Sequence, residues 1–141
     1  MGGPDRLTEI RERFEASAFH RSLLGMRLSR LEPGEAEVTL DIEDRHRNLI
    51  GLVHGGVIAT LADTATGVAM LAMLEDGSVH VTTHLAVAYL APAREGRLLA
   101  RGRVIKRGRR SGYAEADILD AEGRLLARAT TVHAIVAAED Q

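Results

Sequence analysis

The chain has 141 residues, of which 45% are apolar and 27% are charged, and its formal net charge is −2. This length and composition predict one globular domain over residues 1–141 and exclude a large enzyme with a separate cofactor domain. The absence of cysteine excludes disulfides, thiolate metal sites and a cysteine nucleophile, and it is typical of a cytoplasmic protein.

The predicted elements begin with an amphipathic helix over about 5–17, where apolar residues recur at helical spacing. Apolar and polar residues then alternate over 26–31 and again over 36–42. A turn at Pro33-Gly34 separates the two runs, so together they predict a hairpin of two strands.

A long helix is predicted from Gly55 to about Leu74, because this stretch is apolar on nearly every side. Gly77 is expected to end it as a left-handed C-terminal residue. The stretch also carries Asp63 and several threonines, so we expect a buried helix, with no membrane span and no membrane partner. Four strands are expected after it, at about 79–90, 97–106, 112–120 and 124–136.

This order of elements predicts an α+β fold in which a curled antiparallel sheet wraps around the one long helix. The sheet has to enclose the helix because the helix offers almost no polar face to solvent. The core of the fold is expected over about 26–136, with the N-terminal helix added to it.

The start of the long helix carries His54, Gly55 and Gly56. The first N–H groups of a helix have no partner within the helix and lie at the positive end of its dipole. Glycines allow a ligand to approach the backbone closely, so Gly55 and Gly56 could offer N–H donors to a carbonyl oxygen that becomes an oxyanion. The alternative is that the two glycines only make a flexible entry into the helix.

Asp63 stands inside the otherwise apolar helix. Burial of an unpaired carboxylate is costly, so Asp63 is either a base or nucleophile, or a structural group bonded to the hydroxyls of Thr60 and Thr64. Gly55 lies about 12 Å away along the axis at ~1.5 Å per residue, whereas a base must come within about 3 Å of its target. If both groups serve one reaction, two chains must combine, with their helices antiparallel about a two-fold axis.

A spaced set of residues on this segment resembles the signature of hotdog-fold acyl-CoA thioesterases, specifically the phenylacetate-pathway (PaaI-type) group. The set follows the pattern N-x-x-G-x-x-H-G-G-(x)6-D and consists of Asn48, Gly51, His54, Gly55, Gly56 and Asp63. Further along the chain, 82–93 resembles that group's next strand with its L-x-P-A turn, and 104–110 resembles the end of the following strand. The similarity covers about 35–136.

The resemblance implies a hotdog fold, homodimers with shared active sites that commonly pair into homotetramers, and hydrolysis of an acyl-CoA thioester. It implies that Gly55 donates its N–H to the thioester carbonyl and that Asp63 of the partner chain activates water or attacks directly. Asn48 would help to place the water or the carbonyl, and His54 would shape the site near the sulfur. Thr82 would assist near the carboxylate.

The sequence departs from the group's pattern at His84, which replaces the usual acidic residue, and at Ala88, which replaces a polar one. Both changes bear on substrate preference, so aryl and short- or medium-chain acyl groups stay open. Tyr89 and Tyr113 are the candidate aromatic contacts for an aryl group.

Coenzyme A carries a 3′-phosphate and a pyrophosphate, and a basic, Gly-rich turn at 107–110 could contact them. Within this turn we expect Arg109 and Arg110 to bind the phosphates. Ser111 and Gly56 are the other residues expected to bind the substrate.

The histidines also suggest a metal site, which we do not expect. His80 and His84 are expected on one face of a strand with Thr82 between them, but no third ligand is evident. The predicted reaction needs no metal ion and no redox cofactor. The other histidines are interpreted as surface or packing residues: His20, His46 and His133.

Two other functions remain open on the same fold. A non-catalytic acyl-CoA binding or sensing protein would keep Gly55 and the basic turn but would not need Asp63. A hotdog dehydratase or hydratase would use a histidine and an acid in motifs that we do not find. No nucleic-acid partner is expected, because the net charge is near zero and aromatic side chains make up only 3% of the residues.

Overall fold

A computed structural model describes residues 5–137 of the chain. Its α-helices are α1 (Arg6–Glu15) and α2 (Gly55–Leu71), and it also has a short π-helix, η1 (Ala18–Leu23), and a 3-10 turn, η2 (Asp44–His46). The strands are β1 (Met26–Glu32), β2 (Glu35–Asp41), β3 (Ser78–Tyr89), β4 (Arg97–Arg107), β5 (Ser111–Leu119) and β6 (Leu125–Ala137).

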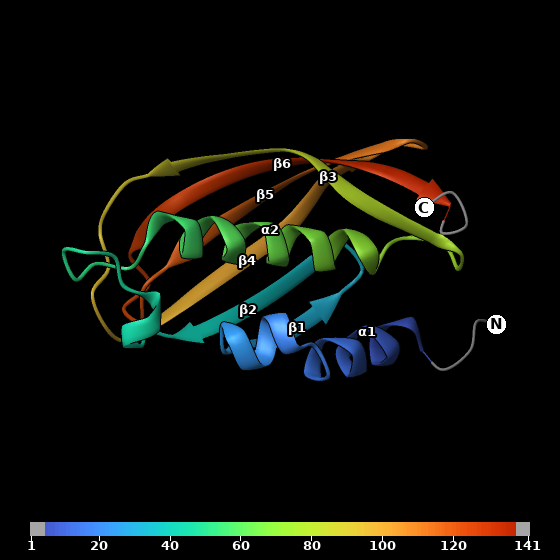
Figure 1. Cartoon of the computed structure of the whole chain (residues 1–141). Coiled ribbons are helices and arrows are strands. Elements are labelled where there is room, and N and C mark those ends of the chain that lie inside the picture. Colours follow the sequence, from blue (N-terminus) through green and yellow to red (C-terminus); the bar gives the residue numbers. More distant parts are fainter. Residues whose placement is uncertain (1–4, 138–141) are drawn as a thin grey trace.

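All of these strands form one antiparallel sheet in the order β1-β2-β4-β5-β6-β3. Figure 1 shows the sheet curling around α2, with α1 and η1 beside β1 and on the same side of the sheet as α2. The expected α+β architecture, a curled antiparallel sheet wrapped around one long helix, is therefore confirmed.

The core lies between α2 and the concave face of the sheet. Leu61, Ala62 and Ala65 on α2 are fully buried. Gly102 of β4 packs directly on the α2 backbone, since a Cβ at this position would lie 2.5 Å from the carbonyl carbon of Ala65. Small residues thus allow the helix to lie close to the sheet, which fixes its position. No helix within residues 5–137 is both long and apolar enough to cross a membrane.

Two local features differ from the predicted elements. The helix α2 ends at Leu71, with Ala72 as a right-handed C-cap, so Gly77 does not terminate it. Gly77 instead has a φ of 84° in the turn that leads into β3. The sequence pattern also predicted no element at η1, which begins where the Ser17 hydroxyl accepts a hydrogen bond from the His20 N–H.

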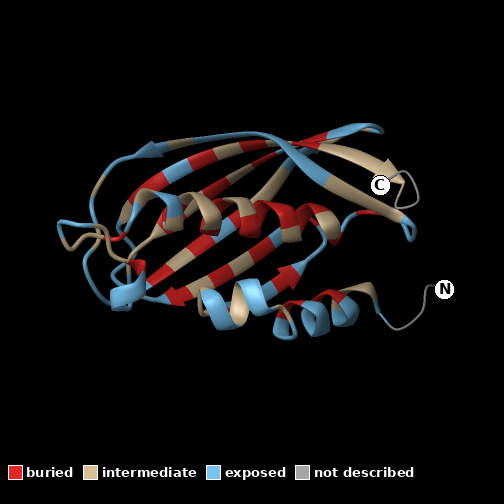
Figure 2. Ribbon diagram, in the orientation of Figure 1, coloured by how far each residue is buried: buried red, intermediate tan, exposed pale blue. Residues whose placement is uncertain are grey.

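The edges of the sheet are β1 and β3, and the two differ in their cover. Apolar residues of α1 pack against Leu31 of β1. On β3, by contrast, Val81, Leu85 and Tyr89 are large apolar side chains that are exposed in the single chain, and Figure 2 shows much of this strand in pale blue. An edge strand with unpaired backbone groups and apolar side chains is a template for pairing with another strand.

Candidate active site

The N-terminus of α2 presents a backbone donor that the chain itself does not use. His54 is the N-cap, and its Nδ1 accepts a hydrogen bond of 2.7 Å from the N–H of Gly56. Within residues 5–137 the N–H of Gly55 has no hydrogen-bond acceptor. Because it also lies at the positive end of the helix dipole, this N–H can bind a ligand oxygen.

Asn48 lies in the loop before α2, where its side chain holds the backbone in place. Its Oδ1 accepts hydrogen bonds of 3.0 Å from the N–H groups of Ile50 and Leu52, and Gly51 completes the turn with a φ of 82°. Among residues 5–137 the amide Nδ2 makes no hydrogen bond, so it can donate to a ligand. Asn48 shares one cavity of about 310 Å³ with Gly55 and another with His54. We call Asn48, His54 and Gly55 the donor half of the site.

Tyr89 supports the donor half from the end of β3. Its hydroxyl donates a hydrogen bond of 2.6 Å to the carbonyl of Gly55. A Cβ on Gly55 would lie 3.3 Å from the phenol ring, so a larger residue here would force the ring to shift by a few tenths of an ångström. Tyr113, the other candidate contact for an aryl group, alternates with the buried Gly112 and Ala114 and faces away from α2, so it lines neither half of the site within one chain, and its contact with an acyl group stays a prediction.

Asp63 lies in the middle of α2, where its carboxylate is half-buried. The hydroxyl of Thr82 on β3 donates a hydrogen bond of 2.8 Å to Asp63 Oδ1. The expected alternative partners on the helix do not bond the carboxylate, since Thr60 donates to the carbonyl of Gly56 and Thr64 makes no bond to Asp63. We call Asp63 and Thr82 the acid half of the site.

The acid half opens into a cavity of about 460 Å³ between α2, β3 and η1. Most of its other lining side chains are apolar, among them Phe19, Val68 and Leu85. A cavity with an apolar wall and one carboxylate fits an apolar group that carries a reactive carbonyl.

The two halves do not share a cavity within one chain. Asp63 and Thr82 line one cavity, and Asn48 and Gly55 line another. This separation agrees with the distance that their positions on one helix require. The structure thus brings the residues expected to be catalytic together in two groups rather than in one.

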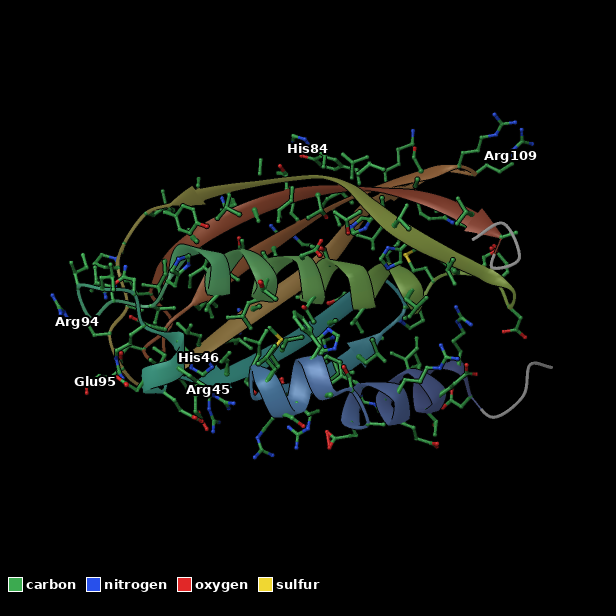
Figure 3. The ribbon with its side chains drawn as sticks, in the orientation of Figure 1. Arg45, His46, His84, Arg94, Glu95 and Arg109 are labelled. Atoms are coloured by element: carbon green, nitrogen blue, oxygen red, sulfur yellow. The ribbon has the colours of Figure 1, made fainter. Side chains whose placement is uncertain are left out.

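The expectation that His80 and His84 share a strand face is wrong. A β-bulge at Thr83 shifts the register between β3 and β6, so that Thr82 pairs with His133 and His84 pairs with Val132. His80 and Thr82 face α2, whereas Figure 3 shows His84 on the outer face of the sheet. Among the described residues, no three His, Asp or Glu side chains form a group that could hold a metal ion.

His80 and His133 form a pair beneath the acid half that the sequence reasoning missed. Their Nδ1 atoms are 3.2 Å apart, and the ring of His133 is fully buried. Burial lowers the pKa of His80, although its contact with the Gly67 carbonyl and the charge of Asp63 oppose this shift. Burial, with a smaller contribution from His80, lowers the pKa of His133 to about 4. The sequence did contain a sign that His133 is buried. Ala127, Ala129 and Thr131 alternate along β6 with more exposed residues, and His133 is the next residue of this inward-facing row.

The basic turn lies between β4 and β5. Arg107 is engaged by Glu75, with an N–O distance of 2.7 Å. Arg109 and Arg110 make no ion pair within the part of the chain that the structure describes, and Figure 3 shows Arg109 at the tip of the turn, away from α2. Neither these arginines nor Ser111 lines the cavities that contain Asp63 or Gly55.

Comparison with known proteins gives consistent results. Residues 50–127 match the thioesterase superfamily. Acyl-coenzyme A thioesterase 13 from Homo sapiens is 31% identical over 121 residues, which cover 84% of this chain and 86% of that protein. A thioesterase from Haemophilus influenzae has a similar structure, with a TM-score of 0.85, 27% identity and coverage of 94% of this chain and 91% of that one. A hypothetical thioesterase from Streptococcus pneumoniae, solved with coenzyme A, has a TM-score of 0.74, 25% identity and coverage of 79% and 89%.

Proposed function

The chain is a hotdog-fold member of the thioesterase superfamily, and we propose that it hydrolyses an aryl- or short- to medium-chain acyl-CoA to the free acid and coenzyme A. Thioester hydrolysis as such is the activity of this family. One observation supports the residue assignment. Each half of the site has only part of what hydrolysis needs: the donor half has the N–H of Gly55, which is unbonded among the described residues, and the acid half has the Asp63 carboxylate, which Thr82 holds in place by a hydrogen bond.

In the proposed reaction the donor half binds the thioester carbonyl. The Gly55 N–H donates to the carbonyl oxygen, and its bond strengthens as negative charge develops on that oxygen. The Asn48 Nδ2 places the carbonyl or the attacking water. His54, fixed by its bond to the Gly56 N–H, lies beside the sulfur.

The acid half of the partner chain supplies the base. Asp63 takes a proton from water as the water oxygen attacks the carbonyl carbon, and the tetrahedral intermediate then expels the thiolate, which takes up the proton. In the alternative route the carboxylate itself attacks, an anhydride forms as the thiolate leaves, and water hydrolyses the anhydride. Thr82 holds one carboxylate oxygen in both routes.

This assignment requires a homodimer. The exposed apolar edge of β3 supports pairing with β3 of a second copy about a two-fold axis, which would place the acid half of each chain near the donor half of the other. Two such dimers would form the proposed homotetramer.

For the rest of the substrate, we assign the acyl group to the apolar cavity beside Asp63. Arg109, Arg110 and Ser111 would bind the phosphates of coenzyme A, and Gly56 would contact the substrate next to the thioester held by Gly55. The solved Streptococcus pneumoniae neighbour with coenzyme A supports a ligand of this class. No metal ion or redox cofactor is needed for these steps.

The test is the release of free thiol from a panel of aryl- and alkyl-CoA thioesters, measured with the wild-type chain and with Asp63→Asn. We expect turnover by the wild type and loss of turnover by the variant. Undiminished activity of the variant would remove Asp63 from the mechanism. Tight binding of acyl-CoA by the wild type without turnover would favour a binding or sensing protein.

A further inference from the structure

We propose that His133 and His80 are positioning residues that hold the Thr82 hydroxyl so that its proton points to Asp63. The proposal rests on the proposed function, because it assigns the pair to the site in which Asp63 acts as base. It follows from four contacts that leave only one arrangement of protons for two neutral rings.

The first contact fixes His80. Its Nε2 lies 2.7 Å from the carbonyl oxygen of Gly67 on α2. A carbonyl oxygen only accepts hydrogen bonds, so His80 Nε2 must carry the proton. In the neutral ring the other nitrogen, Nδ1, is then an acceptor.

The second and third contacts fix His133. Its Nδ1 lies 3.2 Å from the bare Nδ1 of His80, so His133 must carry its proton on Nδ1. Its Nε2 is then bare and accepts from the hydroxyl of Thr131, at 2.8 Å. Thr131 is itself fully buried, which protects this bond from water.

The fourth contact connects the pair to the acid half. His133 Nδ1 lies 3.4 Å from the Thr82 oxygen, so its N–H is shared between Thr82 and His80. Because an N–H faces the lone pairs of this oxygen, the Thr82 proton is directed away from His133 and toward Asp63 Oδ1. The second carboxylate oxygen of Asp63 is then left for water.

The arrangement lasts only while both rings are neutral. The groups that face the pair are Asp63 on α2, the Thr82 hydroxyl on β3 and the Thr131 hydroxyl on β6. Burial keeps both rings neutral at neutral pH, against the attraction of the Asp63 charge. An added proton on His80 Nδ1 would make this atom a donor to His133, and the N–H that faces Thr82 would be lost.

The direct test reads the tautomers without any substrate. Two-bond 1H–15N spectra of the 15N-histidine-labelled protein at pH 7 distinguish a proton on Nδ1 from one on Nε2. We expect His133 as the Nδ1–H tautomer and His80 as the Nε2–H tautomer, assigned with His133→Asn and His80→Asn. A proton on Nε2 of His133 would overturn the proposal.

The functional test compares two replacements at one position. Asn can place an amide N–H near the position of Nδ1, whereas Leu cannot donate. We expect His133→Leu to lower kcat about tenfold with little change in KM and to move the acid limb of the kcat profile to higher pH, and His133→Asn to stay within about threefold of the wild type. Equal losses in the two variants would contradict a positioning role.

Two further variants separate this proposal from its alternatives. Ile118→Ala, a buried change on β5 at a residue that lines neither cavity of the site, is expected to lower the melting temperature without changing kcat, which identifies effects of stability alone. Asp63→Asn separates the two proposals. If Asp63→Asn is inactive while His133→Leu keeps full kcat, the positioning role fails and the proposed function stands. If Asp63→Asn is active, the proposed function fails.

Discussion

The donor half and the acid half lie on one helix, yet they are built in different ways. The donor half consists of a loop and a helix end, and its key group is a backbone N–H whose position depends on neighbouring residues. The acid half consists of side chains from α2 and β3 that bond one another across the fold, and His133 of β6 contacts it through Thr82. A short sequence segment is therefore enough to specify the first half, whereas the second requires the whole sheet.

The largest effect is expected in the acid half. Asp63→Asn should lower kcat by about 1,000-fold or more, because among the described residues no other carboxylate lines its cavity. Thr82→Val should cost only about tenfold, since it removes one hydrogen bond to a group that remains. Thiol-release kinetics measure both, and melting curves check the fold. Equal losses would mean that the Thr82 hydroxyl is as essential as the carboxylate.

A mixed dimer tests whether the two halves come from different chains. Asp63→Asn and Gly55→Ala subunits are each expected to be nearly inactive, but a hybrid dimer would hold one site with both halves intact. After subunits mix at random, about one-quarter of the wild-type activity should return. No gain on mixing, when subunit exchange is shown by mass spectrometry, would contradict the shared site.

Gly55→Ala should damage the donor half alone, by about 100-fold in kcat. The added Cβ would press on the Tyr89 ring and move the N–H out of position. Tyr89→Phe is the matched milder change, since it removes the hydroxyl bond to Gly55 but keeps the ring, and we expect a loss of about fivefold. Steady-state kinetics with one acyl-CoA measure both variants. If Gly55→Ala is fully active, the backbone N–H is not the oxyanion donor.

The buried His133 should make the folding stability of the chain depend on pH. The unfolded chain protonates His133 near pH 6.5, whereas the folded chain does so only near pH 4. The unfolded state therefore binds more protons between these values, and about 2.5 kcal/mol of folding stability should be lost as the pH falls from 6.5 to 4. Urea unfolding at several pH values measures this loss, and His133→Asn should reduce it. An equal slope in the variant would exclude His133 as the cause.

The smallest effect is expected at the basic turn. The double change Arg109→Ala and Arg110→Ala should raise KM for an acyl-CoA about fivefold, more at low salt than at high salt. An acyl thioester of N-acetylcysteamine lacks the phosphates and should show no change. A similar rise in KM for this short substrate would remove the two arginines from phosphate binding.

The sequence predicted the overall fold, and the grouping of Asn48, His54 and Gly55, for physical reasons. The all-apolar helix required an enclosing sheet, and the motif around Gly55 is local in the chain, so its spacing carries its geometry. The expectation that Gly77 ends α2 failed because the helix ended earlier, at Leu71, without a left-handed residue.

The structural setting of the acid half could be predicted only in part. Asp63 and Thr82 were expected near one another from the resemblance, but the roles of His80 and His133 depend on the pairing of β3 with β6, which joins residues 53 positions apart. The bulge at Thr83 also broke the two-residue alternation on which the placement of His84 depended. The catalytic roles of these residues stay predictions.

The bulge at Thr83 also determines that Thr82 and Tyr89 of β3 point to the same face of the sheet. Thr82 and Tyr89 are an odd number of positions apart, and in a regular strand they would face opposite sides of the sheet. The extra residue at Thr83 returns both side chains to the side of α2, where one holds Asp63 and the other supports Gly55. A chain without the extra residue at position 83 would present the same two side chains toward α2 from a regular strand. An insertion of one residue in β3 can therefore be absorbed by a bulge without moving either half of the site.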